Sequence, residues 1–152
     1  MNVTCPNCLS HLSLEALAED ADARKLFGLL SQHEAAAGAL VQYLQLFKAA
    51  KQALRWSRAL RLAQEVTAMV WDHGASADEL QQACVRTVSA MQAKRSRGDW
   101  RPLMSHGYFE RVLAAVLAEA HDAAQARSTS SPTIHAGAQS KRAAALRVLD
   151  ED

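Results

Sequence analysis

Apolar side chains recur at helical intervals over most of this chain, and polar or charged side chains fill the positions between them. The longest such stretch runs from about residue 48 to residue 71, with apolar positions broadly on one face. These positions are Leu54, Ala59, Leu62, Ala63, Val66, Met69 and Val70. Beta-branched residues never alternate over a window of strand length. The pattern therefore predicts an all-α fold.

The first helical stretch begins after residue 12. Ser13 is its expected N-cap, because a serine side chain accepts hydrogen bonds from the free N–H groups of a first helical turn. The stretch reaches about His33, with an expected break near Asp20. A helical period then restarts at Leu40 and continues to Phe47.

Capping residues separate the helices of the second half. Gly74 suits the C-cap of the long helix, and Ser76 followed by Glu79 has the spacing of a capping box. A loop is expected over residues 95–105, before the last core helix. The apolar face of that helix contains Tyr108, Phe109, Val112, Leu113, Val116 and Leu117. We expect a compact bundle of about four to five helices.

Composition divides the chain into three parts. Residues 1–12 are expected to be irregular and contain a cysteine pair, and residues 13–127 to form the helical domain. Residues 128–152 begin with Ser-Thr-Ser-Ser-Pro-Thr, which cannot bury enough apolar surface to order itself. They are expected to be a flexible, disordered tail. No apolar run reaches the length of a membrane span, so we expect no membrane partner and a cytoplasmic location.

The cysteine pair is the sharpest local motif. Cys5 and Cys8 have the spacing of two zinc-binding thiolates, and His11 stands three residues further on. A structural zinc site needs four ligands, so His33, another distant histidine or a partner chain would have to complete it. Cys84 lies on an apolar helix face, where a free cysteine behaves as a small hydrophobic residue. The sequence thus leaves open a Zn²⁺ site or a knuckle without metal.

Charge is distributed unevenly along the 152 residues, although the net charge is only +1. Residues 1–47 carry two Lys or Arg against five Asp or Glu, a net −3. Residues 48–111 carry eleven Lys or Arg against six acids, a net +5. A basic middle segment of this kind favours an acidic partner such as nucleic acid.

Two groups of cations account for the basic middle segment. The first recurs every three or four residues, which predicts a stripe along one side of a helix: Lys48, Lys51, Arg55, Arg58 and Arg61. The second surrounds an aromatic residue: Lys94, Arg95, Arg97 and Arg101, with Trp100. Spaced cations bind phosphates, and an aromatic ring among them can stack on an unpaired base. The alternatives are a solvated helix face and a tryptophan that packs its loop onto the core.

Catalytic motifs are missing from the sequence. No pair of the six histidines has the His-x-x-x-His spacing of a metal-binding helix face. The chain has neither a glycine-rich phosphate loop nor a Gly-x-Ser-x-Gly nucleophile elbow. We therefore expect a binding protein rather than an enzyme.

Several segments resemble small phage and prophage proteins that accompany replication genes. These proteins share the N-terminal Cys-Pro-x-Cys, the Tyr-Leu-x-Leu-Phe sequence at 43–47 and the Lys-x-Ala-Leu-x-Trp sequence at 51–56. The later part is similar to the C-terminal helical domain of DnaD- and DnaT-like primosomal proteins. The similarity there lies in Glu79-Leu80, the basic loop and the ending Tyr108 to Leu113.

This resemblance implies a replisome organiser or helicase loader without its own ATPase. Such a protein binds single-stranded or forked DNA and contacts a replicative helicase or another replisome protein, in the host cytoplasm if it is phage-encoded. Formation of a homo-oligomer stays open. The competing hypothesis is a phage-encoded inhibitor or adaptor that binds a host protein without DNA. A zinc-knuckle transcription regulator is a third.

Overall fold

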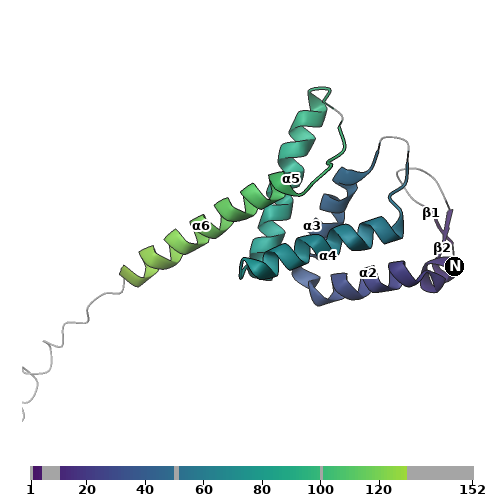
Figure 1. Cartoon of the computed structure of the whole chain (residues 1–152), viewed down its shortest axis with the longest axis horizontal. Helices are drawn as coiled ribbons and strands as arrows, with labels where there is room; N and C mark the ends of the chain where they lie inside the picture. Colours follow the sequence, from purple (N-terminus) through teal and green to yellow (C-terminus); the bar gives the residue numbers. More distant parts are fainter. Residues whose placement is uncertain (1, 5–10, 50–51, 100, 130–152) are drawn as a thin grey trace, which may run out of the picture. The chain divides into compact units, whose positions relative to one another are not determined.

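The computed structural model describes residues 2–4, 11–49, 52–99 and 101–129 (Figure 1). The chain divides into two compact units, residues 1–119 and residues 120–152, and the fold described below is that of the first. In chain order the elements are β1 (Asn2–Thr4), β2 (His11–Ser13), α1 (Leu14–Glu19), α2 (Ala21–Gln32), α3 (Glu34–Leu44), the 3-10 helix η1 (Gln45–Phe47), α4 (Trp56–Asp72), α5 (Ala77–Ser96) and α6 (Gly107–Thr129). The predicted all-α fold class is confirmed.

The N-terminus carries a small strand pair within the stretch that was expected to be irregular. β1 and β2 pair antiparallel, with Asn2 opposite Ser13 and Thr4 opposite His11. Cys5 and Cys8 belong to the connecting residues 5–10, which lie outside the described part of the chain. The zinc site therefore stays a prediction.

The helical stretch after residue 13 breaks at Asp20, as predicted. The Asp20 carboxylate accepts hydrogen bonds from the N–H groups of Asp22 (2.9 Å) and Ala23 (3.0 Å), which makes it the N-cap of α2. α3 begins at Glu34, six residues before the predicted restart at Leu40. The intervening alanines show little apolar periodicity, but alanine is the strongest helix former and continues the helix.

The predicted helix from residue 48 to residue 71 is wrong in its first third. α4 begins only at Trp56, with Arg55 as its N-cap, and the described residues between η1 and Arg55 are not helical. This segment offers mainly alanines for burial until Leu54, so a helix there would have no apolar face to pack. The face begins with Ala59 and Leu60, which are buried.

Two glycines end α4 and α5 with the same hydrogen-bonding pattern. Gly74 and Gly98 both have positive φ, 64° and 92°, a conformation that costs glycine nothing. After α4, the N–H groups of Gly74 and Ala75 donate to the carbonyls of Trp71 and Val70, which is a Schellman motif. The N–H groups of Gly98 and Asp99 repeat it at the end of α5. Both turns therefore stop their helices sharply.

The predicted capping box opens α5. The Glu79 N–H donates to the Ser76 hydroxyl, and the Ser76 N–H donates to the Glu79 carboxylate. α6 begins at Gly107, and its buried residues Phe109, Leu113 and Val116 come from the predicted apolar face. It continues to Thr129, two residues into the predicted tail, and residues 130–152 lie outside the described part.

The core forms where α3 packs against α5 and α2 packs against α4. Tyr43 on α3 lies at its centre, with the rings of Phe109 and Phe47 at 5.0 Å and 5.5 Å. Cys84 is also fully buried, and burial raises the pKa of its thiol to about 12. The thiol therefore stays uncharged and packs as a small hydrophobic side chain. Among the described helices, none is long and apolar enough to cross a membrane.

Candidate nucleic-acid interface

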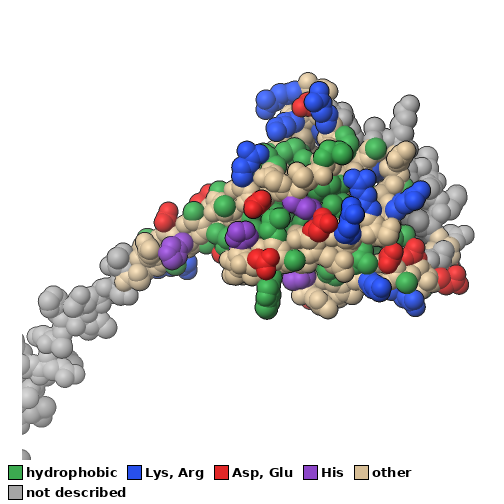
Figure 2. Space-filling model, viewed as in Figure 1, with side chains coloured by type: hydrophobic (Ala, Val, Ile, Leu, Met, Phe, Trp, Pro, Cys, Tyr) green, Lys and Arg blue, Asp and Glu red, His purple; other side chains and the backbone are tan. Residues whose placement is uncertain are grey.

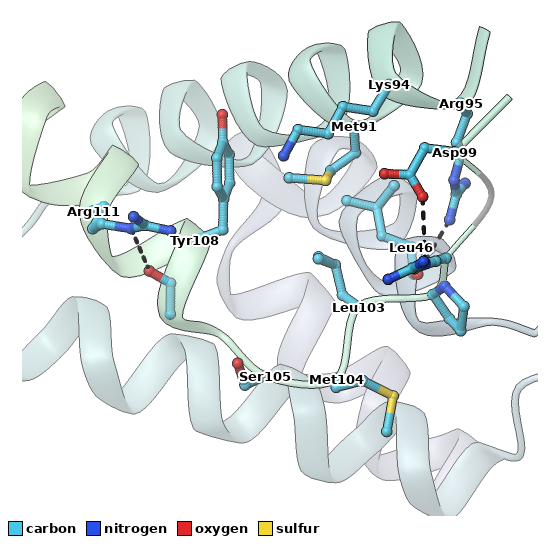
Figure 3. A pocket seen from close by; sticks show the side chains of 13 residues that line it. Leu46, Met91, Lys94, Arg95, Asp99, Leu103, Met104, Ser105, Tyr108 and Arg111 are labelled. Carbon is cyan, nitrogen blue, oxygen red and sulfur yellow. Dashed lines mark hydrogen bonds and ion pairs between the residues drawn. The ribbon is translucent and has the colours of Figure 1, made fainter. Parts of the chain in front are cut away.

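A pocket of about 580 Å³ opens between the end of α5, the loop 97–106 and the start of α6 (Figure 3). We call it the α5–α6 pocket. Its described lining consists of cations, apolar side chains and a few other groups: Lys94, Arg95, Arg101, Arg111, Leu46, Met91, Pro102, Leu103, Met104, Tyr108, Asp99, Ser105 and Gly107. Asp99 is the one acid among these lining residues, so the pocket carries a local excess of positive charge.

Two cations from different helices flank the Tyr108 ring in this pocket (Figure 3). The Lys94 Nζ of α5 lies 5.1 Å from the ring centroid, and the Arg111 guanidinium carbon of α6 lies 5.7 Å from it. Both distances are within the range of cation–π attraction. Neither cation forms an ion pair with a carboxylate among the described residues. Their charges are thus held in place without being neutralised.

The carbonyl of Leu46, in η1, anchors this pocket to the core. It accepts hydrogen bonds from the Leu103 backbone N–H (2.9 Å) and from the Arg95 guanidinium (3.2 Å). One bond fixes the loop and the other fixes the last turn of α5. Asp99 and Arg101 add an ion pair at 3.6 Å, but the Arg101 side chain is 91% exposed, so that pair contributes little stability.

A second basic region lies at the start of α4. Lys48, Arg55 and Arg58 line a smaller pocket of about 140 Å³, and we call these three residues the α4 basic cluster. The first turn of α4 contains no acid and its N-cap makes no side-chain hydrogen bond, so the positive end of the helix dipole adds to their charge. Figure 2 shows Lys and Arg gathered over the start of α4 and over the end of α5 on one face, with acidic and histidine side chains between.

The predicted helical stripe is therefore wrong as a helical feature. Lys48 precedes the loop, Arg55 is the N-cap, and only Arg58 and Arg61 lie on α4. The loop nevertheless brings Lys48 to the two arginines. Arg61 instead faces Glu65, with its Nε 3.6 Å from the carboxylate. Lys51 lies outside the described residues.

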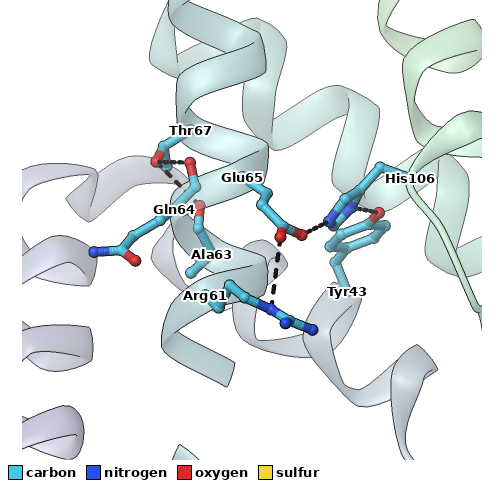
Figure 4. Close-up of polar contacts among 7 residues, drawn as sticks. All are labelled: Tyr43, Arg61, Ala63, Gln64, Glu65, Thr67 and His106. Carbon is cyan, nitrogen blue, oxygen red and sulfur yellow. Dashed lines mark hydrogen bonds and ion pairs between the residues drawn. The ribbon is translucent and has the colours of Figure 1, made fainter. Parts of the chain in front are cut away.

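The loop before α6 is fixed by a chain of polar contacts that the sequence analysis missed (Figure 4). The His106 Nδ1 lies 2.7 Å from the Tyr43 hydroxyl, and its Nε2 lies 3.0 Å from the Glu65 carboxylate. Burial, before all other causes, raises the pKa of Tyr43 well above its ordinary value, so the phenol keeps its proton. Tyr43 then donates to Nδ1, which leaves Nε2–H to donate to Glu65.

A hydroxyl, an imidazole and a carboxylate follow one another in this chain of contacts, as they do in a catalytic triad. The hydroxyl, however, is not accessible to a substrate. Tyr43 has no exposed surface, and neither Tyr43 nor His106 lines the α5–α6 pocket. A nucleophile or general acid must reach the reacting group, so this phenol is poorly placed for chemistry. The contacts instead tie α3, α4 and the loop 97–106 together.

The structure brings part of the second predicted cation group together in the α5–α6 pocket, where two side chains of α6 join it. Lys94, Arg95 and Arg101 line one pocket, whereas Arg97 is the exposed C-cap of α5 and does not. Trp100 lies outside the described residues. The additions are Tyr108 and Arg111. The one signal that points to them is their place at the start of α6, which follows the end of α5 across a short loop, but only the fold shows that both line this pocket.

For a metal ion, the described residues offer no group of three or more His, Cys, Asp or Glu that could hold one. His11 is placed on β2, and nothing further follows for Cys5 and Cys8. The fold defines a helical domain with a basic, partly apolar pocket.

The chain belongs to the HI_1489_N family, described as an N-terminal domain, which it matches over residues 1–105. It is similar to an uncharacterized protein of Haemophilus influenzae, with 38% identity over 114 residues. That alignment covers 71% of this chain but only 60% of the relative's length. No solved structure matches the chain. The family match ends at residue 105, just before α6.

Proposed function

We propose that this protein is a non-enzymatic accessory protein that binds single-stranded or forked DNA through the α5–α6 pocket. The observation that carries the proposal is the convergence of Lys94 and Arg111 on Tyr108, from two helices and without an ion pair to any carboxylate in the described part of the chain. Cations held on rigid elements bind phosphates, and the apolar side chains beside them in the pocket suit a strand with exposed bases.

The α4 basic cluster supports the same function. Its three cations stand at the N-terminus of a 17-residue helix, where the backbone also attracts anions. A strand held at the α5–α6 pocket could make further phosphate contacts there. These would be independent of sequence, because phosphates carry no base information.

The replication part of the proposal rests on the resemblance to primosomal proteins. Under it, the protein is a replisome organiser or helicase loader, and its protein partner is a replicative helicase. A surface that binds DNA and a separate surface for the helicase are both needed for that role.

Salt-dependent binding of a labelled single-stranded oligonucleotide and of a labelled fork tests the proposal. Each phosphate contact contributes about 0.7 to the slope of log affinity against log salt for single strands. We expect Lys94→Ala and Arg111→Ala each to lower that slope. Lys25→Ala, which removes an exposed cation from α2, is the matched control and should not. No binding by the wild-type protein at low salt would refute the proposal.

A second candidate function is a protein-binding adaptor or inhibitor that ignores DNA. Trp71 favours it, because its side chain is 85% exposed on the last turn of α4 and tryptophan is enriched at binding hot spots. If the wild-type protein binds no DNA, and Trp71→Ala abolishes retention of a host protein, this function leads.

A further inference from the structure

The α5–α6 pocket combines two surfaces that a simple phosphate site does not need. Its cations stand beside an apolar wall formed by Met91, Leu103 and Leu46, and Figure 3 shows the side chains of Met91 and Leu103 turned toward Tyr108 and Leu46. Because Leu103 is tied to the Leu46 carbonyl, this wall is part of the folded core rather than of a mobile loop. A ligand that uses the whole pocket must therefore carry both an anion and an apolar group.

The size of the pocket supports the same conclusion. At about 580 Å³ it falls in the range of about 300–1,000 Å³ typical of sites for organic molecules. A lone phosphate would leave most of this volume, and all of the apolar wall, unused. The α4 basic cluster, at about 140 Å³, has room for little more than an anion.

We infer that the α5–α6 pocket takes one unpaired nucleotide, with the base against Met91 and Leu103 and the phosphate at Lys94. This inference rests on the proposed function and deepens it, because it assigns the preference for single strands to one pocket. A paired base is stacked within its duplex and cannot enter. An unpaired base enters with its flat apolar face, as in other single-strand binding sites.

The first test compares two single-stranded oligonucleotides of equal length and phosphate number, one with bases and one abasic. Burial of one base against the apolar wall predicts that the wild-type protein binds the natural strand at least about fivefold more tightly. Equal affinities would overturn the inference and leave DNA binding intact. Failure to bind either strand would instead overturn the proposed function.

The second test places a variant in the apolar wall. Met91→Ala should lower the ratio of natural to abasic affinity without changing the salt slope, since no charge is removed. Lys94→Gln removes a charge, so it should lower the salt slope and leave the ratio of natural to abasic affinity unchanged. Met69→Ala is the matched control. Met69 is also half-buried against the core, but it lies on α4 and is not among the described lining residues of the α5–α6 pocket. A Met91→Ala protein with the wild-type ratio would overturn the assignment of the wall.

Competition by free ligands tests the wild-type protein even if Met91→Ala does not fold. Deoxyadenosine monophosphate should displace the oligonucleotide at a lower concentration than inorganic phosphate does. Equal potency would overturn the inference, because the base would then contribute nothing. An oligonucleotide affinity no better than that of the free mononucleotide would keep the nucleotide pocket but overturn a DNA strand as its source.

Discussion

The α5–α6 pocket and the α4 basic cluster are both basic, but the fold holds them in different ways. The loop at the α5–α6 pocket is tied to the core by long-range contacts, from Leu103 to the Leu46 carbonyl and from His106 to Tyr43. The described hydrogen bonds in the loop before α4 are local, such as Gln52 N–H to the Ala49 carbonyl at 3.2 Å.

This difference teaches that positive charge alone does not distinguish a specific site from a general one. The α5–α6 pocket adds an apolar wall and an aromatic ring to its cations, so it can recognise more than a phosphate. The α4 basic cluster offers cations around a small hollow, which suits contact with a strand backbone. We therefore expect substitutions in the two regions to have different consequences.

Charge reversal separates the two regions most strongly. Lys94→Glu combined with Arg111→Glu removes two charge-assisted contacts, and single-strand affinity should fall by about 100-fold or more. Arg55→Glu with Arg58→Glu changes the charge equally and should weaken binding far less. Titration of a labelled oligonucleotide measures both. Equal losses would show that the two regions do not differ.

The anchoring of the loop predicts the next largest effect, on stability. His106→Phe leaves the buried Tyr43 hydroxyl without its acceptor and should lower the free energy of unfolding by about 1–3 kcal/mol. Chemical denaturation measures this loss. His121→Phe, at an exposed position on α6, should cost close to nothing. Adding Tyr43→Phe to His106→Phe should restore part of the loss, and a variant as stable as the control would refute the anchor.

A single cation of the α4 basic cluster tests the claim that this region contacts only the backbone. Arg58→Ala should lower the log–log salt slope by about 0.7 and weaken binding to natural and abasic strands by the same factor. Measurement of both strands at several salt concentrations checks this. A change in the natural-to-abasic ratio would contradict the division of roles between the two regions.

The smallest expected effect comes from the acid at the pocket rim. Asp99→Asn removes the one carboxylate among the described lining residues and frees Arg101 from its ion pair. Because both groups are exposed, single-strand affinity should rise only about twofold to fivefold. Weaker binding in this variant would mean that Asp99 helps to hold the ligand.

Most of the helical architecture could be predicted, because it depends on local signals. The Asp20 break, the Ser76 and Glu79 capping box and the Gly74 turn are each encoded within a few residues. The start of α4 could not, since a regular spacing of cations resembles a helix face even where no apolar face accompanies it. The helix needs Ala59 and Leu60 to pack, and charge spacing does not report packing.

The candidate site could be predicted only in part, for a related reason. Lys94, Arg95 and Arg101 are close in sequence, so their clustering was visible. Arg111 reaches the same pocket only because the chain turns back between α5 and α6. The pairing of Tyr43 with His106 spans 63 positions and joins two residues that carry no local motif. Contacts of this kind arise from the tertiary fold.

Hydrogen–deuterium exchange with and without a single-stranded oligonucleotide tests the central claim most directly. It reports which backbone segments are protected by the ligand, and it requires no substitution. The account predicts protection at residues 91–111, around the α5–α6 pocket, with weaker protection at residues 52–61. Binding that protects residues 52–61 alone, or no protection at residues 91–111 when the strand is bound, would contradict it.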